Sequence, residues 1–288
     1  MKIRIRIKYT ATAPISHIGE TASTGSYFQT IKTADGRLPI ITGNSVRGTL
    51  RDNGAKYLLD TLGIKVSKEI FNVLFSGGNL NGTMKNDVAK AKAVREHFPF
   101  ISLFGGGLGD MIMAGKMAVG NLYPLVAETY ETLGEPMTDV SWKNLIDEIE
   151  FTRTDDGKDD VLAEYIENVE EEKKAKASTQ MRFSVQYMAK GTEFVQDIHF
   201  FDNVTPLEMG AFYSAIVEWF KLPKIGGMAS KGFGTFLATV GNNLVVVDDS
   251  GIQICDDVKS LISSYNDFIK SEGCEFIDIL GSGKSAKK

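Results

Sequence analysis

The chain has 288 residues, of which 43% are hydrophobic and 24% are charged. This composition is typical of a folded protein and excludes wholesale disorder. Two cysteines and three scattered histidines are too few for a disulfide framework or a zinc site, so we expect no metal and no cofactor. No apolar run reaches the roughly 20 residues that cross a bilayer, and the N-terminus lacks a signal-peptide pattern. We therefore expect a cytoplasmic protein.

The net charge of −5 is distributed unevenly along the chain. Residues 144–172 contain twelve acids against two bases, a net charge of −10. Residues 1–57 contain nine bases against three acids, a net charge of +6. An anion-binding surface near the N-terminus is therefore expected despite the acidic average.

The N-terminal residues predict a strand followed by a long loop. Over residues 2–10, isoleucines alternate with lysines and arginines, which is the period of a half-buried strand. Its cationic face has two interpretations: a solvated face that prevents edge-to-edge aggregation, or a sheet surface that faces RNA. Residues 14–36 are rich in serine, threonine and glycine and are expected to form a loop.

Periodicity and turn residues predict the other elements. Helices are expected over residues 66–74, 87–98 and 206–220, with a weak helix over 138–150. Strands are expected over 38–41, 116–123 and 235–240, with a hairpin over 182–188 and 192–199.

An anion-binding helix start is predicted after the strand at 38–41. Asn44 or Ser45 can cap a helix that runs to about Leu62. Arg47 and Arg51 are four residues apart, so they project from one face of its first turns. Together with the helix N-terminus they would bind an anion, usually phosphate. The alternative is two surface arginines that pair with acids elsewhere.

A glycine-rich stretch follows the helix expected at 206–220. Residues 225–234 read IGGMASKGFG, with four glycines around a serine and a lysine. Glycine lets a chain pass close to a phosphate backbone, which the amides and Lys231 would face. No P-loop spacing fits this stretch, and the glycines at 105–109 do not fit a dinucleotide-binding motif. A plain helix-to-strand connection is the alternative.

Three features in this order resemble the RAMP superfamily of CRISPR-associated proteins. They are the basic N-terminal strand, residues 39–51 (PIITGNSVRGTLR) and the glycine-rich loop at 226–234. Residues 189–194 (AKGTEF) are similar to the hairpin that follows the thumb insertion of that family. The resemblance covers about residues 1–240.

The resemblance implies an α+β fold with a ferredoxin-like palm, similar to an RNA-recognition motif. The palm would span residues 1–240, with a helical insertion at about 53–115 and a thumb insertion at about 150–182. Residues 241–288 would add a C-terminal strand and helix extension and a basic tail.

Within the superfamily, the chain resembles the backbone (Cascade-like) subunit of effector complexes, most of all the type IV backbone protein. Such a subunit binds the guide RNA along its phosphates, polymerises head to tail and presents the guide for pairing. The implied partners are CRISPR RNA, target nucleic acid paired to it, further copies of the chain and other effector-complex subunits, but no membrane. The implied RNA-binding residues are His17, Ser26, Tyr27, Asn44, Ser45, Arg47, Arg51, Arg153, Arg182, Gly226, Gly227, Met228, Ser230 and Lys231.

No catalytic residue is expected. Family members that cleave target RNA use an aspartate in the loop before the Leu-Pro-x-Ile-x-Gly strand, a position that falls at about Tyr27 here. The only acids in the loop are Glu20 and Asp35. Without a carboxylate at that position, metal-assisted attack by a ribose hydroxyl lacks its organiser.

Two alternatives stay open. One is a guide-processing endoribonuclease of the same superfamily, in which His17 would be the general base, with Tyr27 or Lys32 nearby in sequence. The other is a stand-alone protein that binds single-stranded RNA without assembling.

Overall fold

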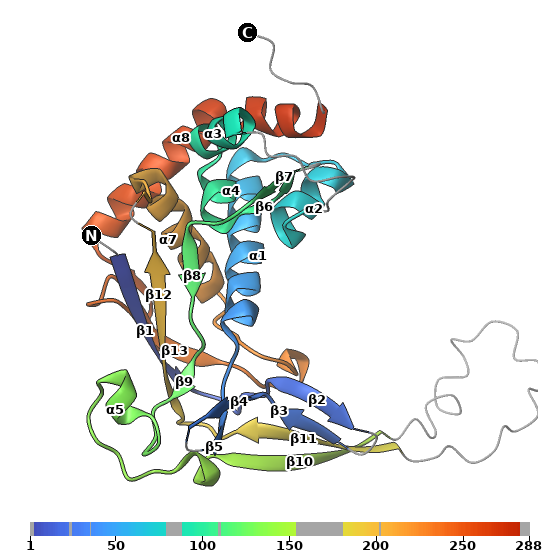
Figure 1. The fold of residues 1–288 in the computed structure, drawn as a ribbon, viewed down its shortest axis with the longest axis vertical. Coiled ribbons are helices and arrows are strands. Elements are labelled where there is room, and N and C mark those ends of the chain that lie inside the picture. The colour runs from blue at the N-terminus through green and yellow to red at the C-terminus, as the bar shows by residue number, and fades with distance from the viewer. Residues whose placement is uncertain are drawn as a thin grey trace, which may run out of the picture.

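The largest sheet of this computed structural model joins strands from both ends of the chain (Figure 1). In spatial order its strands are β15 (Gly251–Ile254), β14 (Val245–Asp248), β13 (Phe236–Val240), β1 (Ile3–Ala11), β12 (Glu193–Phe200) and β8 (Met117–Val119), and β9 (Tyr123–Pro124) also pairs with β12. The structure describes residues 3–22, 25–34, 36–78, 88–108, 111–153, 181–201 and 203–282.

Two long helices cover one face of this sheet. They are α1 (Gly43–Leu62) and α7 (Pro206–Phe220), which lie side by side in Figure 1. Along the chain the elements follow as β1, α1, β8, β12, α7 and β13, and the four strands lie in the order β13, β1, β12, β8. This is the β-α-β-β-α-β connectivity of a ferredoxin-like sheet, so the predicted α+β fold is confirmed.

The core lies between this sheet and the two helices. Ile5, Ile7 and Tyr9 of β1 are buried, as the alternating pattern predicts. The Phe236 ring packs edge-on against two others. Its centroid lies 5.3 Å from that of Tyr9 and 5.2 Å from that of Trp219 of α7. This packing fixes the orientation of α7 and of the glycine-rich stretch that follows it.

A second sheet, which we call the arm sheet, crosses the lower end of the molecule in Figure 1. Its strands in spatial order are β10 (Ile146–Arg153), β11 (Met181–Met188), β3 (Gly25–Phe28) and β2 (Ile18–Ala22). Strands β10 and β11 flank the expected thumb insertion, of which residues 154–180 lie outside the described residues.

Two sequence predictions are wrong here. Residues 14–36 are not a loop, because they form β2, β3 and β4 (Thr30–Thr33), and β4 forms a hairpin with β5 (Gly36–Pro39). The weak helix expected over 138–150 is instead a short 3-10 helix, Trp142–Asn144, followed by β10. Strand pairing decides the structure over local composition in both cases: β10 and β3 pair with the distant β11, while β2 pairs with β3 and β4 with β5.

Several helices lie around the C-terminal end of α1, away from the arm sheet (Figure 1). They are α2 (Lys68–Ser76), α3 (Val88–His97), α4 (Pro99–Phe104) and the C-terminal α8 (Asp256–Ser282), with the small hairpin β6 (Gly106–Leu108) and β7 (Met111–Met113). A further short helix, α5 (Tyr130–Leu133), lies in the connection between β9 and β10. Over the described ranges, none of the helices combines the length and apolar character needed to traverse a bilayer.

Candidate nucleic-acid interface

The glycine-rich loop is held against the segment that follows β1. The Gly227 amide donates to the carbonyl of Ser16 at 2.7 Å, and the Gly234 amide donates to that of Pro14 at 2.8 Å. Gly226 has φ +79°, and a Cβ added there would lie 2.2 Å from the Ser16 oxygen. Only glycine tolerates both the left-handed backbone and this close approach.

The tip of this loop presents unused backbone donors. Met228 adopts a left-handed conformation, and Ala229–Lys231 form one 3-10 turn. The amides of Met228, Ala229 and Ser230 donate to no group among the described residues. Consecutive amides in such a turn form a concave anion-binding surface. Since Ala229, Ser230 and Lys231 are exposed, the surface is open to a polymer.

Lys231 lies over two aromatic rings of the arm sheet. Its Nζ is 3.9 Å from the centroid of Phe151 and 4.7 Å from that of Phe183, and the two rings stack on each other. These cation–π contacts join the glycine-rich loop to the base of the expected thumb. Sequence reasoning missed both phenylalanines, because Phe151 follows a stretch that was expected to be helical.

The start of α1 does not form the predicted free anion site. Thr42, rather than Asn44 or Ser45, is the N-cap, and its hydroxyl accepts from the Ser45 amide. The Gly43 amide donates to the Asn121 side chain at 2.9 Å. Nε2 of His17 accepts from the Thr42 amide at 3.2 Å. These partners use several of the donors that a bound phosphate would need.

His17 should make stability depend on pH. Burial lowers the pKa of His17, because the half-buried ring loses part of the water that would solvate its charged form. The folded state therefore binds the proton less well than the unfolded state, and stability falls as the pH drops below about 6.5. His17→Gln keeps an acceptor without titrating and should flatten urea-unfolding stability between about pH 7 and 5. The exposed His199→Gln is the control; equal flattening in both variants would contradict the assignment.

Arg51 is buried, which corrects the prediction that it faces RNA. Only 5% of it is exposed, and its guanidinium donates to the carbonyls of Phe104 at 2.8 Å and Gly105 at 2.7 Å. Longer contacts reach the Val73 and Leu74 carbonyls, both at 3.4 Å. Burial and the neighbouring Arg47 charge lower its pKa to about 10, so it stays charged at neutral pH.

The guanidinium of Arg51 therefore caps the C-terminal ends of α2 and α4, where carbonyls are unsatisfied and a positive charge is stabilising. Arg47 also donates to the Phe104 carbonyl and is half-buried. Both arginines tie α1 to the helices packed around it. The predicted alternative, pairing with acids, is not what the structure shows either, because the partners are carbonyls.

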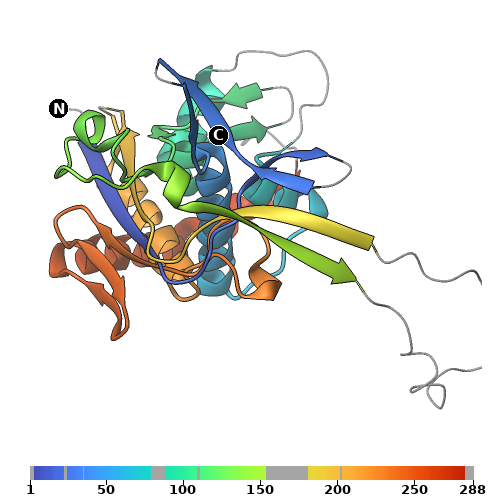
Figure 2. The same ribbon diagram turned by 90° about the horizontal axis from the view of Figure 1, so that it is seen from below.

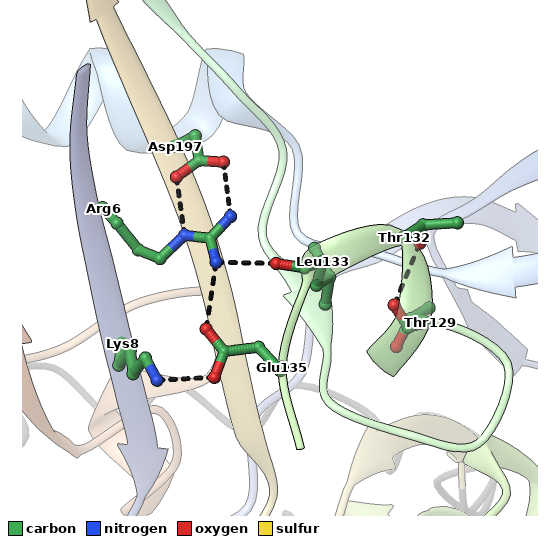
Figure 3. Close-up of polar contacts among 7 residues, drawn as sticks. All are labelled: Arg6, Lys8, Thr129, Thr132, Leu133, Glu135 and Asp197. Atoms are coloured by element: carbon green, nitrogen blue, oxygen red, sulfur yellow. Dashed lines mark hydrogen bonds and ion pairs between the residues drawn. The ribbon is translucent and has the colours of Figure 1, made fainter. Parts of the chain in front are cut away.

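Arg6 and Lys8 on the cationic face of β1 pair with carboxylates within the molecule (Figure 3). Arg6 forms a two-bond ion pair with Asp197, both bonds at 2.9 Å, and also reaches Glu135 at 3.0 Å. Lys8 reaches the other oxygen of Glu135 at 2.5 Å. The Arg6 hydrogen bond lowers the pKa of Asp197, which keeps this pair charged. Of the two interpretations of this face, a free surface for RNA finds no support at Arg6 and Lys8.

The other predicted residues are placed as follows. Ser26 and the exposed Tyr27 lie on β3, with Tyr27 opposite Glu20 of β2. Asn44 is exposed in the first turn of α1. Arg153 and Arg182 lie on β10 and β11, beside the expected thumb. Their roles in RNA binding stay predictions.

Comparisons with known proteins identify a family and a similar fold. A model of the RAMP superfamily matches residues 8–236. A chain of a solved structure described as "Type IV-B CRISPR Complex" has a TM-score of 0.60 and 20% identity, over 83% of this chain and 91% of that chain. At this identity the likeness concerns the fold. No curated protein sequence matches.

Proposed function

This chain belongs to the RAMP superfamily, as its motifs predicted, and on that premise we propose that it is a guide-RNA-binding backbone subunit of a CRISPR effector complex. The observation that carries the proposal is the tip of the glycine-rich loop. Three consecutive amides that donate to no described residue lie there together with Lys231 on an exposed surface. Amides and an ammonium contact phosphate rather than base edges, so binding would depend little on sequence.

Head-to-tail assembly is the second part of the proposal. Asp147, Glu148 and Glu150 are exposed on β10, which is an edge strand of the arm sheet. An acidic edge favours a basic surface of the next copy over pairing with an identical edge, because like charges repel. A contact between two different surfaces of one chain propagates into a filament unless rotation closes it.

A catalytic role is not part of the proposal. The nuclease alternative needs His17 as a general base, but its Nε2 accepts from the Thr42 amide and burial lowers its pKa. At Tyr27, where family members that cleave have an aspartate, the chain has a phenol. We propose that the subunit binds and presents RNA without cutting it.

The proposed function is tested by the salt dependence of RNA binding and by the size of the protein–RNA species. If each subunit contacts about four phosphates, the slope of log K against log salt should lie near −2.8, from roughly −0.7 per contact. Lys231→Ala should make the slope less steep by about 0.7, whereas the exposed Lys190→Ala should not. On long RNA the protein should elute as large species and leave the RNA intact in magnesium. Salt-independent binding would refute the phosphate contacts, and elution as a monomer would refute head-to-tail assembly. Cuts in the RNA at regular intervals would refute the non-catalytic role.

A further inference from the structure

Most cations of the N-terminal region contact acids or backbone carbonyls within the fold. The sequence places nine of them in residues 1–57. Arg6 and Lys8 pair with acids, Lys56 pairs with Glu218 at 2.7 Å, and Arg47 and Arg51 donate to carbonyls. Arg4 lies near Asp197, whose pKa it helps to lower. The expected positive surface must therefore come from the cations that remain.

The remaining described cations lie opposite each other on one hairpin. Lys32 of β4 and Arg37 of β5 are direct cross-strand partners, and both are exposed. Among the described residues neither contacts a carboxylate, and the Arg37 guanidinium donates to the Thr30 hydroxyl at 2.8 Å. Like charges directly opposite on a hairpin are destabilising. A pair of like charges kept without a carboxylate contact among the described residues favours an external anion as its partner.

The face of the β4–β5 hairpin that lies opposite Lys32 and Arg37 packs against the rest of the protein. Ile31 and Leu38 are also cross-strand partners, and they pack with Ile40, Val126 and Trp142 in a small apolar cluster separate from the main core. This packing orients Lys32 and Arg37 outwards. The two cations are therefore displayed on an anchored element.

The hairpin and the glycine-rich loop are attached to the same short segment. The Ser16 carbonyl accepts from Gly227 of the loop at 2.7 Å. The carbonyl of the next residue, His17, accepts from Gln29 at the start of the hairpin, also at 2.7 Å. In Figure 2 the hairpin and the loop stand on opposite sides of the β10–β11 pair. A nucleic acid that contacts both elements would therefore pass around the β10–β11 pair.

We propose that Lys32 and Arg37 form a second phosphate-binding site, for the backbone of a nucleic-acid strand. This rests on the proposed function and adds a site to it. Two cations side by side match consecutive phosphates, and arginine can contact a phosphate through two donors. The strand is either the guide itself or the strand paired to it, since both carry the same phosphates.

Two binding measurements test the site and separate the two sources. The first is binding of single-stranded RNA, and the second is binding of a complementary strand to the preformed protein–RNA complex. For Lys32→Ala/Arg37→Ala, the salt slope should become less steep by about 1.4 in one of them, from two lost contacts of roughly 0.7 each. The control is Lys65→Ala/Lys68→Ala, which removes two exposed cations near the start of α2. The thermal midpoint of the hairpin variant should hold or rise, since like-charge repulsion is removed.

A change of salt slope only in the binding of single-stranded RNA assigns the site to the guide. A change only in the binding of the complementary strand assigns it to the paired strand. Slopes unchanged in both, or changed equally by the control, would overturn the inference. So would loss of assembly with both slopes unchanged, because the pair would then bind an acidic surface of a second copy. If the parent protein binds RNA with the expected slope, these results reject only the hairpin site and leave the proposed function standing.

Discussion

Replacing Arg51 with alanine is expected to lower the free energy of unfolding by about 3 kcal/mol. The change removes a buried charged donor. Among the described residues it leaves the Gly105 carbonyl at the end of α4 without a partner and the Phe104 carbonyl with Arg47 alone. Hydrogen bonds to a charged group contribute more than neutral ones, and buried acceptors left unpaired are costly. Urea denaturation monitored by circular dichroism measures the effect.

Arg47→Ala is the matched control for Arg51→Ala. Arg47 lies one turn earlier on the same helix and shares the Phe104 partner, but it is only half-buried. Its loss should cost about 1 kcal/mol or less. If Arg51→Ala is as stable as the parent and binds RNA more weakly, Arg51 faces RNA after all and the structural role is wrong.

Gly226→Ala is expected to weaken RNA binding by roughly tenfold or more, since each lost amide contact contributes about 1 kcal/mol. The new Cβ would lie 2.2 Å from the Ser16 oxygen, and the φ of +79° is unfavourable for alanine. Both effects push the loop away from Ser16 and disrupt the arrangement of its free amides. Fluorescence anisotropy with a labelled single-stranded RNA reports the loss.

Gly48→Ala shows whether any glycine substitution has this effect. Gly48 is exposed within α1, and a Cβ there would meet nothing within 4 Å. Alanine is the better helix former by about 1 kcal/mol, so this variant should be as stable as the parent or more so and should bind RNA normally. Equal affinity in both variants would remove the glycine-rich loop from the interface.

The sequence by itself determined the elements that local patterns encode. The alternation of β1 and the helix of 206–220 follow from side-chain period, which acts within a few positions. The order of these motifs also identified the superfamily. These features do not depend on contacts between segments that are distant in the sequence.

Only the tertiary structure decided which of the basic residues are available to a ligand. Arg6 meets Asp197 across 191 positions of sequence, and Arg51 meets carbonyls more than 50 positions away. Likewise, pairing with the distant β11 places β3 within the arm sheet. A cation's availability depends on whether folding brings an acceptor to it, and a contact between distant segments leaves no local pattern. Spacing alone therefore favoured Arg51. Lys32, which contacts no carboxylate among the described residues, lies in the stretch that composition marked as loop, and Arg37 follows directly after it.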